Sequence, residues 1–231
     1  MMYLSRVRVT TEGLDRKCLV SLLSGDAYAN HQLLWRLFGD ATERSFLFRQ
    51  ETEQDQLSPD HNPRGLPLFY VLSEQVPTAV PGLLELETKP FSPALATGDQ
   101  LTFRLRANPT ISRKTESGRS ARHDVLMDAK SWCKHHGVND RSEVQSHMVD
   151  AAITWLNNQS EKSGFNMVSA PQLTGYRQHA IRRKGTEIRF SSIDYEGVLT
   201  VTHPERFKDM LCRGLGRSKA FGCGLMMVRR A

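Results

Sequence analysis

The stretch PERFKDMLCRGLGRSKAFGCGLMMVRR, residues 204–230, contains the signals of a helix, a glycine-rich turn and a strand in direct succession. Pro204 is tolerated in a first helical turn, the apolar residues that follow recur at helical spacing, and Gly214 ends the helix. The residues after Gly224 predict a closing strand. This segment therefore predicts a helix, a turn and a strand at the end of the second half of the chain.

Strands are predicted wherever apolar residues alternate with polar ones or where β-branched and aromatic residues cluster. The predicted strands lie at residues 3–10, 46–51, 66–73, 83–91 and 101–108, in a pair around a basic turn at 181–190, and at 195–201. Between the second and third of these, the polar residues 51–65 predict a loop.

Two further helices are predicted from apolar residues at helical spacing. The first lies at residues 26–38 and is ended by Gly39. The second has a buried face formed by Val144, Met148, Ala151, Ala152, Trp155 and Leu156. Residues 111–124 are too polar to pack, so they predict a mobile loop.

The segment 92–99 contains Pro, Ser and Gly and is the best candidate for a domain boundary. It separates a predicted N-terminal domain, residues 1–92, from a C-terminal domain, residues 99–231. Each half has approximately the order strand, helix, strand, strand, strand, with a further helix clear only in the second. The pattern predicts an α+β protein with two tandem ferredoxin-like (RRM-like) domains.

The composition is that of a folded chain: 231 residues, 39 % of them hydrophobic, with no apolar run near the eighteen or so that a membrane span needs. The first residues read as a strand and not as a signal peptide, so we expect a cytoplasmic protein without a membrane partner. The four cysteines are far apart and indicate neither a disulfide framework nor a zinc site: Cys18, Cys133, Cys212 and Cys223. Cys133, His135 and His136 match no common ligand spacing, so we expect no metal and no cofactor.

Positive charge is the clearest compositional signal of function. The formal net charge is +6, and the cations gather in a few segments, which indicates either a polyanionic partner, foremost nucleic acid, or a solvated basic surface. One such segment is the predicted hairpin turn, which carries Arg177, Arg182, Arg183, Lys184 and Arg189. A projecting basic hairpin can enter a groove of folded RNA, although a solvated hairpin tip has the same composition.

The turn at residues 214–224 combines bare backbone with positive charge. Its glycines are Gly214, Gly216, Gly222 and Gly224, and they enclose Arg217 and Lys219. The segment lies between a helix and a strand, so it is neither a Walker loop nor a dinucleotide fingerprint. Its N–H groups could hold phosphate oxygens, or the glycines could form a tight connection between packed elements.

His31 is the candidate for acid–base chemistry. It shares one face of the first helix with Tyr28, Leu34, Trp35 and Phe38. The residue is either a satisfied core histidine or a partly desolvated group that moves a proton near neutral pH. RNA supplies its own nucleophile in the 2′-OH, so strand scission needs a base or acid and a group that stabilises the pentacoordinate phosphate. Tyr28 could bind a phosphoryl oxygen or position the hydroxyl, or it could be a packed aromatic residue.

Five segments, in their order and spacing, closely resemble the CasE (Cse3) family of repeat-processing endoribonucleases of type I-E CRISPR Cascade, within the RAMP superfamily. They are HQLLWRLF, FLFRQE, FRLRANP, YEGVLTV and GLGRSKAFGCGL. The resemblance covers essentially the whole chain, and FRLRANP and the glycine-rich turn are its most specific parts.

The resemblance implies tandem ferredoxin-like domains and metal-independent cleavage of precursor CRISPR RNA at the 3′ base of the repeat hairpin. The implied products are a 5′-hydroxyl and a 2′,3′-cyclic phosphate, after which the enzyme stays on the hairpin and joins other Cascade subunits. His31 matches the family's catalytic histidine and Tyr28 its upstream tyrosine. The turn at 214–224 matches its glycine-rich loop, and residues 181–189 match its RNA-contacting hairpin. The second hypothesis is a non-catalytic RAMP-type scaffold that binds the hairpin without cutting it.

Overall fold

The computed structural model describes residues 1–10, 20, 27–39, 41–52, 67–114, 118, 120–183 and 186–231, apart from the side chains of residues 182, 183 and 186. The chain divides into two compact units. The first consists of Met1–Pro93 with Lys219–Leu225, and the second of Ala94–Ser218 with Met226–Ala231. The predicted loop at 51–65 falls almost wholly outside the described residues.

The first unit contains a four-stranded antiparallel sheet with the strand order β2-β3-β1-β4. Its elements are β1 (Met2–Val9), α2 (Ala27–Trp35), the 3₁₀ turn η1 (Arg36–Phe38), β2 (Phe46–Thr52), β3 (Pro67–Ser73) and β4 (Leu84–Phe91). Since β3 lies between β1 and β2, the chain forms a split β-α-β arrangement, as expected of a ferredoxin-like unit. Residues 74–83, between β3 and β4, form no helix.

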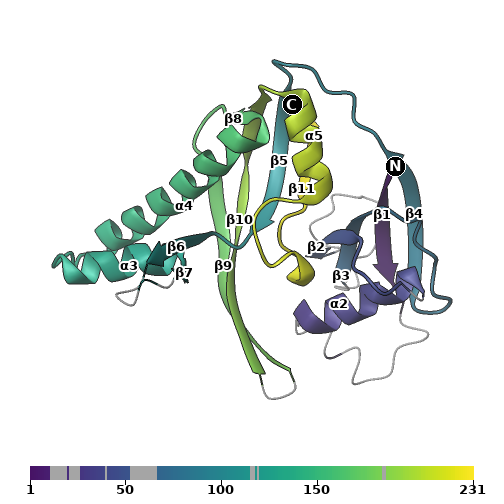
Figure 1. Cartoon of the computed structure of the whole chain (residues 1–231), viewed down its shortest axis with the longest axis horizontal. Helices are drawn as coiled ribbons and strands as arrows, with labels where there is room; N and C mark the ends of the chain where they lie inside the picture. Colours follow the sequence, from purple (N-terminus) through teal and green to yellow (C-terminus); the bar gives the residue numbers. More distant parts are fainter. Residues whose placement is uncertain are drawn as a thin grey trace. The chain divides into compact units, whose positions relative to one another are not determined.

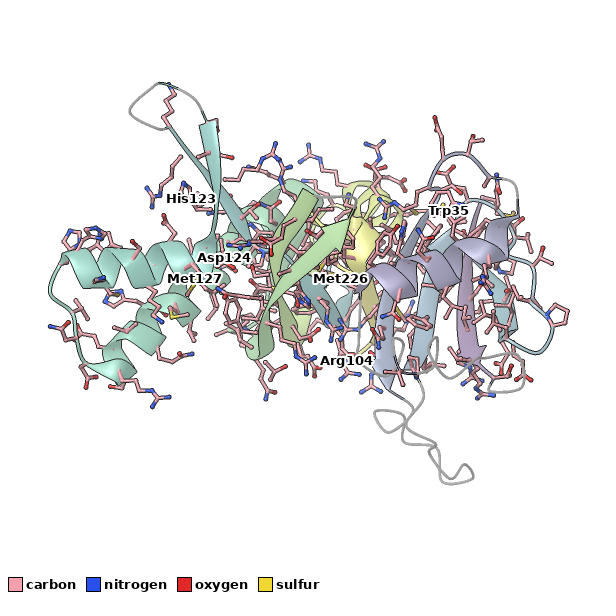
Figure 2. All side chains as sticks on the ribbon, turned by 90° about the horizontal axis from the view of Figure 1, so that it is seen from below. Trp35, Arg104, His123, Asp124, Met127 and Met226 are labelled. Carbon is pink, nitrogen blue, oxygen red and sulfur yellow. The ribbon has the colours of Figure 1, made fainter. Side chains whose placement is uncertain are left out.

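The core of the first unit lies between α2 and one face of this sheet. Alternate residues of each strand point to that face, among them Val7, Phe46 and Phe69, and pack against Leu33 and Leu34 of the helix. Figure 2 shows α2, which carries Trp35, in front of the strands. The helix that bears His31 is therefore anchored by a buried apolar core.

The second unit has the strand order β11-β5-β10-β8. Read from β8, it matches that of the first unit, with β8, β10, β5 and β11 in the places of β2, β3, β1 and β4. In addition, β9 pairs with β10 from Thr186 to Glu196. Its strands are β5 (Gln100–Ala107), β6 (Thr110–Lys114), β7 (Ser120–Asp124), β8 (Phe165–Met167), β9 (Gln172–Arg183), β10 (Thr186–Val201) and β11 (Met226–Arg230). Its helices are α3 (Val125–His135), α4 (Arg141–Ser163) and α5 (Pro204–Arg213), whereas the 3₁₀ turn η3 (Lys219–Phe221) that follows them belongs to the first unit.

The prediction of two ferredoxin-like α+β units is confirmed by both strand orders. The predicted further helix of the second half is α5, which starts at Pro204 and ends at Gly214. Helix α4 covers the same sheet, where Trp155 stacks on the buried Tyr195 at 6.1 Å between ring centroids and the Tyr195 hydroxyl donates to the Ala152 carbonyl. No helix in the described part of the chain is long and apolar enough to cross a membrane.

The prediction of a mobile loop at residues 111–124 was wrong for residues 111–114 and 120–124, whereas residues 115–117 and 119 lie outside the described residues. Strands β6 and β7 pair there as an antiparallel hairpin, and α3, which the sequence pattern missed, follows directly. The Arg113 guanidinium donates to both carboxylate oxygens of Asp128 in α3, which lowers the pKa of that carboxyl group. Asp124 caps α3 by accepting from the Met127 N–H at 2.9 Å (Figure 2). The polar residues are thus used in pairing and capping.

A second correction concerns residues 186–201, which we expected to form two separate strands. They form the single strand β10, with a register shift against β9 between Ser192 and Asp194. A bulge of this kind re-aims the side chains without ending the pairing. The strand therefore continues from the sheet into the basic hairpin.

Gly164, which ends α4, provides a test of the packing in the second unit. Its φ is +79°, and a Cβ atom would lie 2.5 Å from the His203 carbonyl oxygen, which belongs to the backbone. We expect Gly164→Ala to lower the free energy of unfolding by about 2 to 4 kcal/mol, because backbone strain and a backbone clash add. Urea denaturation measures this loss.

Gly137 offers a matched control, since its φ is +74° but a Cβ atom there would meet nothing within 4 Å. Gly137→Ala tests the strain alone, and we expect a loss of about 1 kcal/mol. Equal losses for the two variants would contradict the packing around Gly164.

Candidate functional site

The predicted aromatic stripe on α2 contains half-buried residues, Trp35 among them, as well as buried ones. Tyr28 and His31 are half-buried, Leu34 is fully buried, and Phe38 in η1 belongs to the core. His31 therefore lies at the edge of the core and not inside it. A histidine at this position is held by its neighbours and is also partly accessible.

Aromatic rings fix the orientation of the His31 imidazole. Its centroid is 5.5 Å from that of Trp35, edge to face, and 6.1 Å from that of Phe46, nearly parallel. Phe46 stacks in turn on Phe38 at 4.7 Å. The Nε2 atom of His31 is buried, although the side chain as a whole is half-buried. The imidazole is thus held by packing and keeps part of its surface accessible.

Helix α2 is also joined to β2 by a polar contact. Nδ2 of Asn30, a residue 1 % exposed, donates to Oε1 of Gln50 at 2.6 Å. Because Asn30 precedes His31, this bond fixes the helix turn that carries the histidine. Neither amide was identified from the sequence, where an Asn in a helix interior was the only available signal.

The glycine-rich stretch divides between the two units, with the change between Ser218 and Lys219. The part that begins at Lys219 includes η3, which contacts both α2 and β2. The structure therefore brings the element that starts with Lys219 to the helix of His31 and Tyr28, although the two segments lie far apart in the sequence. Lys219 is half-buried there.

Two glycines of this stretch are required by close packing. Gly216 has a φ of +76°, and a Cβ atom would lie 3.3 Å from the Trp155 ring in the second unit. Gly222 has a φ of +81°, and its Cβ atom would lie 3.0 Å from Phe48 in the first. The interpretation as a tight connection between packed elements thus accounts for these two positions.

The other residues of the stretch that we predicted to bind RNA differ in accessibility. Gly214 ends α5 and is half-buried, Arg217 is exposed, and Gly224 is buried. Between them, Ser218 has a φ of +57° and accepts a 2.6 Å hydrogen bond from Nδ2 of Asn108. Asn108 is the asparagine of the FRLRANP segment, so this hydrogen bond joins that segment to the glycine-rich stretch.

The predicted RNA-contacting hairpin consists of β9 and β10 in the second unit. Arg177 is exposed on β9. Arg189 is exposed on β10 and pairs with Glu187 at 2.6 Å, a surface pair that contributes little stability and leaves the arginine able to exchange partners. The turn itself carries Lys184, which lies outside the described residues, as do the side chains of Arg182 and Arg183.

The Cys133, His135 and His136 cluster separates in the structure. Cys133 is buried, whereas the two histidines are exposed at the end of α3, where each places Nδ1 near a backbone carbonyl one turn earlier. In the part of the chain that the structure describes, no group of three or more His, Cys, Asp or Glu residues could hold a metal ion. The described cysteines, Cys133, Cys212 and Cys223, form no disulfide bond with one another.

Comparison with known proteins gives matches over nearly the whole chain. The model of a family described as CRISPR associated protein matches residues 2–230. The chain is 28 % identical over 217 residues to the CRISPR system Cascade subunit CasE of Escherichia coli, covering 93 % of this chain and 98 % of the relative. It is 30 % identical over 151 residues to the CRISPR-associated endoribonuclease Cse3 of Thermus thermophilus, covering 61 % and 60 %.

Solved structures show the same fold. A structure of CRISPR endoribonuclease Cse3 bound to a 19-nucleotide RNA has a TM-score of 0.65 at 24 % identity, covering 99 % of this chain and 100 % of that one. The crystal structure of Cas6e from Escherichia coli has a TM-score of 0.64 at 23 % identity, with the same coverage. The tandem arrangement described above is therefore shared with these proteins.

Proposed function

Because this chain belongs to the family of CRISPR-associated proteins, we propose that it is an endoribonuclease that processes precursor CRISPR RNA and serves as a subunit of a Cascade complex. The support from relatives is that one of nearly equal length is named a Cascade subunit and another an endoribonuclease. The structural observation that carries the proposal is the half-buried His31 at the edge of an aromatic core.

The proposed reaction needs no metal ion. The 2′-oxygen attacks the adjacent phosphorus while the bond from phosphorus to the 5′-oxygen breaks, leaving a 2′,3′-cyclic phosphate and a 5′-hydroxyl. One proton leaves the 2′-OH and one is delivered to the 5′-oxygen, so a single imidazole can serve as the base or as the acid. The cut lies at the 3′ base of the repeat stem-loop.

We assign three roles around α2. His31 transfers a proton, and Tyr28, one turn earlier on the same face, binds a phosphoryl oxygen or positions the 2′-OH. Lys219 supplies the positive charge that stabilises the pentacoordinate phosphate, since its element η3 contacts the helix that carries the other two. Lys219 also belongs to the same unit as His31.

The RNA stem binds, in this proposal, to the basic hairpin and to the exposed Arg217 of the glycine-rich stretch. The hairpin turn contributes Arg182, Arg183 and Lys184, with Arg177 and Arg189 on its strands. Cations in this arrangement contact phosphates along a helical stem. A product held in this way stays bound, which suits a subunit that keeps the mature RNA.

A non-catalytic RNA-binding scaffold is the competing function. The observation that favours it is the burial of His31 Nε2 among aromatic rings, as in an ordinary core histidine. The decisive experiment incubates the protein with its host's CRISPR repeat RNA in excess EDTA, beside an RNA with a 2′-deoxy nucleotide at the mapped cut. Cleavage that the deoxy substitution blocks supports the proposal. Tight binding without cleavage supports the scaffold.

The role of the hairpin turn makes a separate prediction about salt. We expect Arg182→Gln with Arg183→Gln to weaken binding of the stem-loop and to reduce the slope of log affinity against log salt by about 1 to 2, because two phosphate contacts are lost. Filter binding at salt concentrations from roughly 50 to 300 mM measures this slope.

Arg213→Gln is the matched control, since Arg213 is an exposed arginine at the end of α5, paired with Asp209. We expect it to leave the salt slope unchanged. An equal slope for the hairpin variant and the wild type would place the RNA contacts elsewhere.

A further inference from the structure

Two aromatic rings face each other across the β9–β10 hairpin. His179 is paired in register with Phe190, and their ring centroids are 4.4 Å apart with the planes 11° from parallel. Both side chains are half-buried, and Nε2 of His179 lies 2.8 Å from Oγ of Ser192. The rings are therefore held in a defined orientation while they remain partly accessible.

The pair lies on a part of the hairpin with two strands. β5 pairs with β10 from Ile193 to Thr200, whereas the described pairing of β10 from Thr186 to Ser192 is with β9. Figure 1 shows the two strands running on beyond the end of β5 toward the turn. At this level no third strand of the described chain pairs with the hairpin, and both rings keep part of their surface accessible.

Positive charges lie close to these rings. Arg177 is two residues before His179 and so shares its face of the strand, and Arg106 is held by Asp194 at 2.8 Å. Burial, and then the charges of Arg106 and Arg177, lower the pKa of the His179 imidazole. At neutral pH the imidazole is uncharged, so the site offers aromatic surface beside guanidinium groups.

The distance from the turn indicates what the pair can meet. Strand β9 continues for four residues beyond His179, to Arg183, which corresponds to roughly 13 Å of extended strand. The minor groove of an A-form RNA stem is wide and shallow. With the turn in this shallow groove, the aromatic pair lies outside the duplex and can meet nucleotides that are not paired.

We propose that the stacked pair of His179 and Phe190 is a binding platform for one unpaired base of the RNA, at the foot of the stem held by the hairpin turn. Bases in a duplex are already stacked, whereas an unpaired base is free to stack on an aromatic side chain. Arg177 holds the phosphate of the same nucleotide. This inference rests on the proposed function and adds a second, single-stranded element to the recognised RNA.

The test compares two RNAs, the repeat stem-loop with its unpaired flanks and the same stem-loop without them, each with a 2′-deoxy nucleotide at the cut. Phe190→Leu removes the ring and keeps an apolar side chain. We expect it to bind the flanked RNA roughly 5- to 150-fold more weakly and the bare stem-loop within about twofold of wild type, since one stacked base is lost. Placing 2-aminopurine in the flank, on the 5′ or the 3′ side, should give fluorescence quenching only where the pair is intact.

Phe190→Tyr keeps the ring and should have the wild-type affinity for the flanked RNA. Ile188→Leu, in the neighbouring cross-strand pair with Ile181, should change the affinity for neither RNA. Equal weakening for both RNAs would show that the pair only shapes the ribbon, and an unchanged affinity for both would exclude it from the RNA site. Either result overturns this inference and leaves the proposed function standing, provided that the wild-type protein cleaves the RNA without the deoxy substitution. A wild-type protein that binds neither RNA would overturn the proposed function as well.

Discussion

Replacing His31 by alanine is expected to slow RNA cleavage by roughly 10²- to 10⁴-fold, the contribution of a positioned general acid or base. The imidazole is held against Trp35 and Phe46, so its proton can be transferred without a search for the correct orientation. The affinity for the repeat stem-loop should change by less than about twofold, because in the proposed complex the basic hairpin and Arg217 hold the RNA. Single-turnover cleavage, measured beside equilibrium binding, separates the two effects.

Two further variants make this test specific. His31→Gln keeps a polar side chain of similar size but cannot transfer a proton near neutral pH, so it should be as slow as the alanine variant. Gln32→Ala changes the exposed neighbour on α2 and should cleave at the wild-type rate. Cleavage by His31→Gln at the wild-type rate would show that His31 is a core residue and that another group transfers the proton.

Replacing Lys219 by methionine is expected to slow cleavage by roughly 10²- to 10³-fold, as for the loss of one group that stabilises a charged transition state. Methionine keeps the apolar part of the half-buried side chain, so η3 should stay on α2 and β2. Lys219→Arg keeps the charge and should recover part of the rate. The measurement is again single-turnover cleavage at saturating protein.

Arg217→Gln is the matched control for Lys219, because it removes a cation two residues earlier on the part of the stretch that belongs to the second unit. It should weaken binding of the stem-loop and leave the saturated cleavage rate nearly unchanged. If Lys219→Met lowers affinity alone, as Arg217→Gln is expected to do, Lys219 binds the RNA and another cation faces the scissile phosphate.

The packing around two glycines explains why the glycine-rich stretch needs residues without a side chain. Gly216 and Gly222 each leave room for an aromatic ring, Trp155 in one unit and Phe48 in the other. The stretch is therefore packed at two points, and Lys219 follows the change from one unit to the other. Close packing of the backbone and presentation of a cation are both served by the same segment.

The sequence by itself determined the elements whose signals are local. The helix from Pro204 to Gly214 was predicted from a tolerated proline, apolar spacing and a terminal glycine, all within one segment. The five strands predicted before residue 109 were found within one or two residues of their expected ends. Binary patterning of this kind is sufficient for the α+β class and for two units of the same order. The placement of His31 on an aromatic helix face was likewise a local property.

Only the tertiary structure decided how distant residues combine. Residues 111–114 and 120–124 pair as strands, and Arg113 meets Asp128 on the next helix, a partner that no alternation of apolar residues reveals. Asn108 and Ser218 bond across 110 positions of sequence. The assignment of Lys219 to the unit of His31 depends on packing of η3 on α2 and β2. The physical reason is common to these cases: side-chain pairing and ring packing act across space, whereas periodicity reports only which face of its own element a residue occupies.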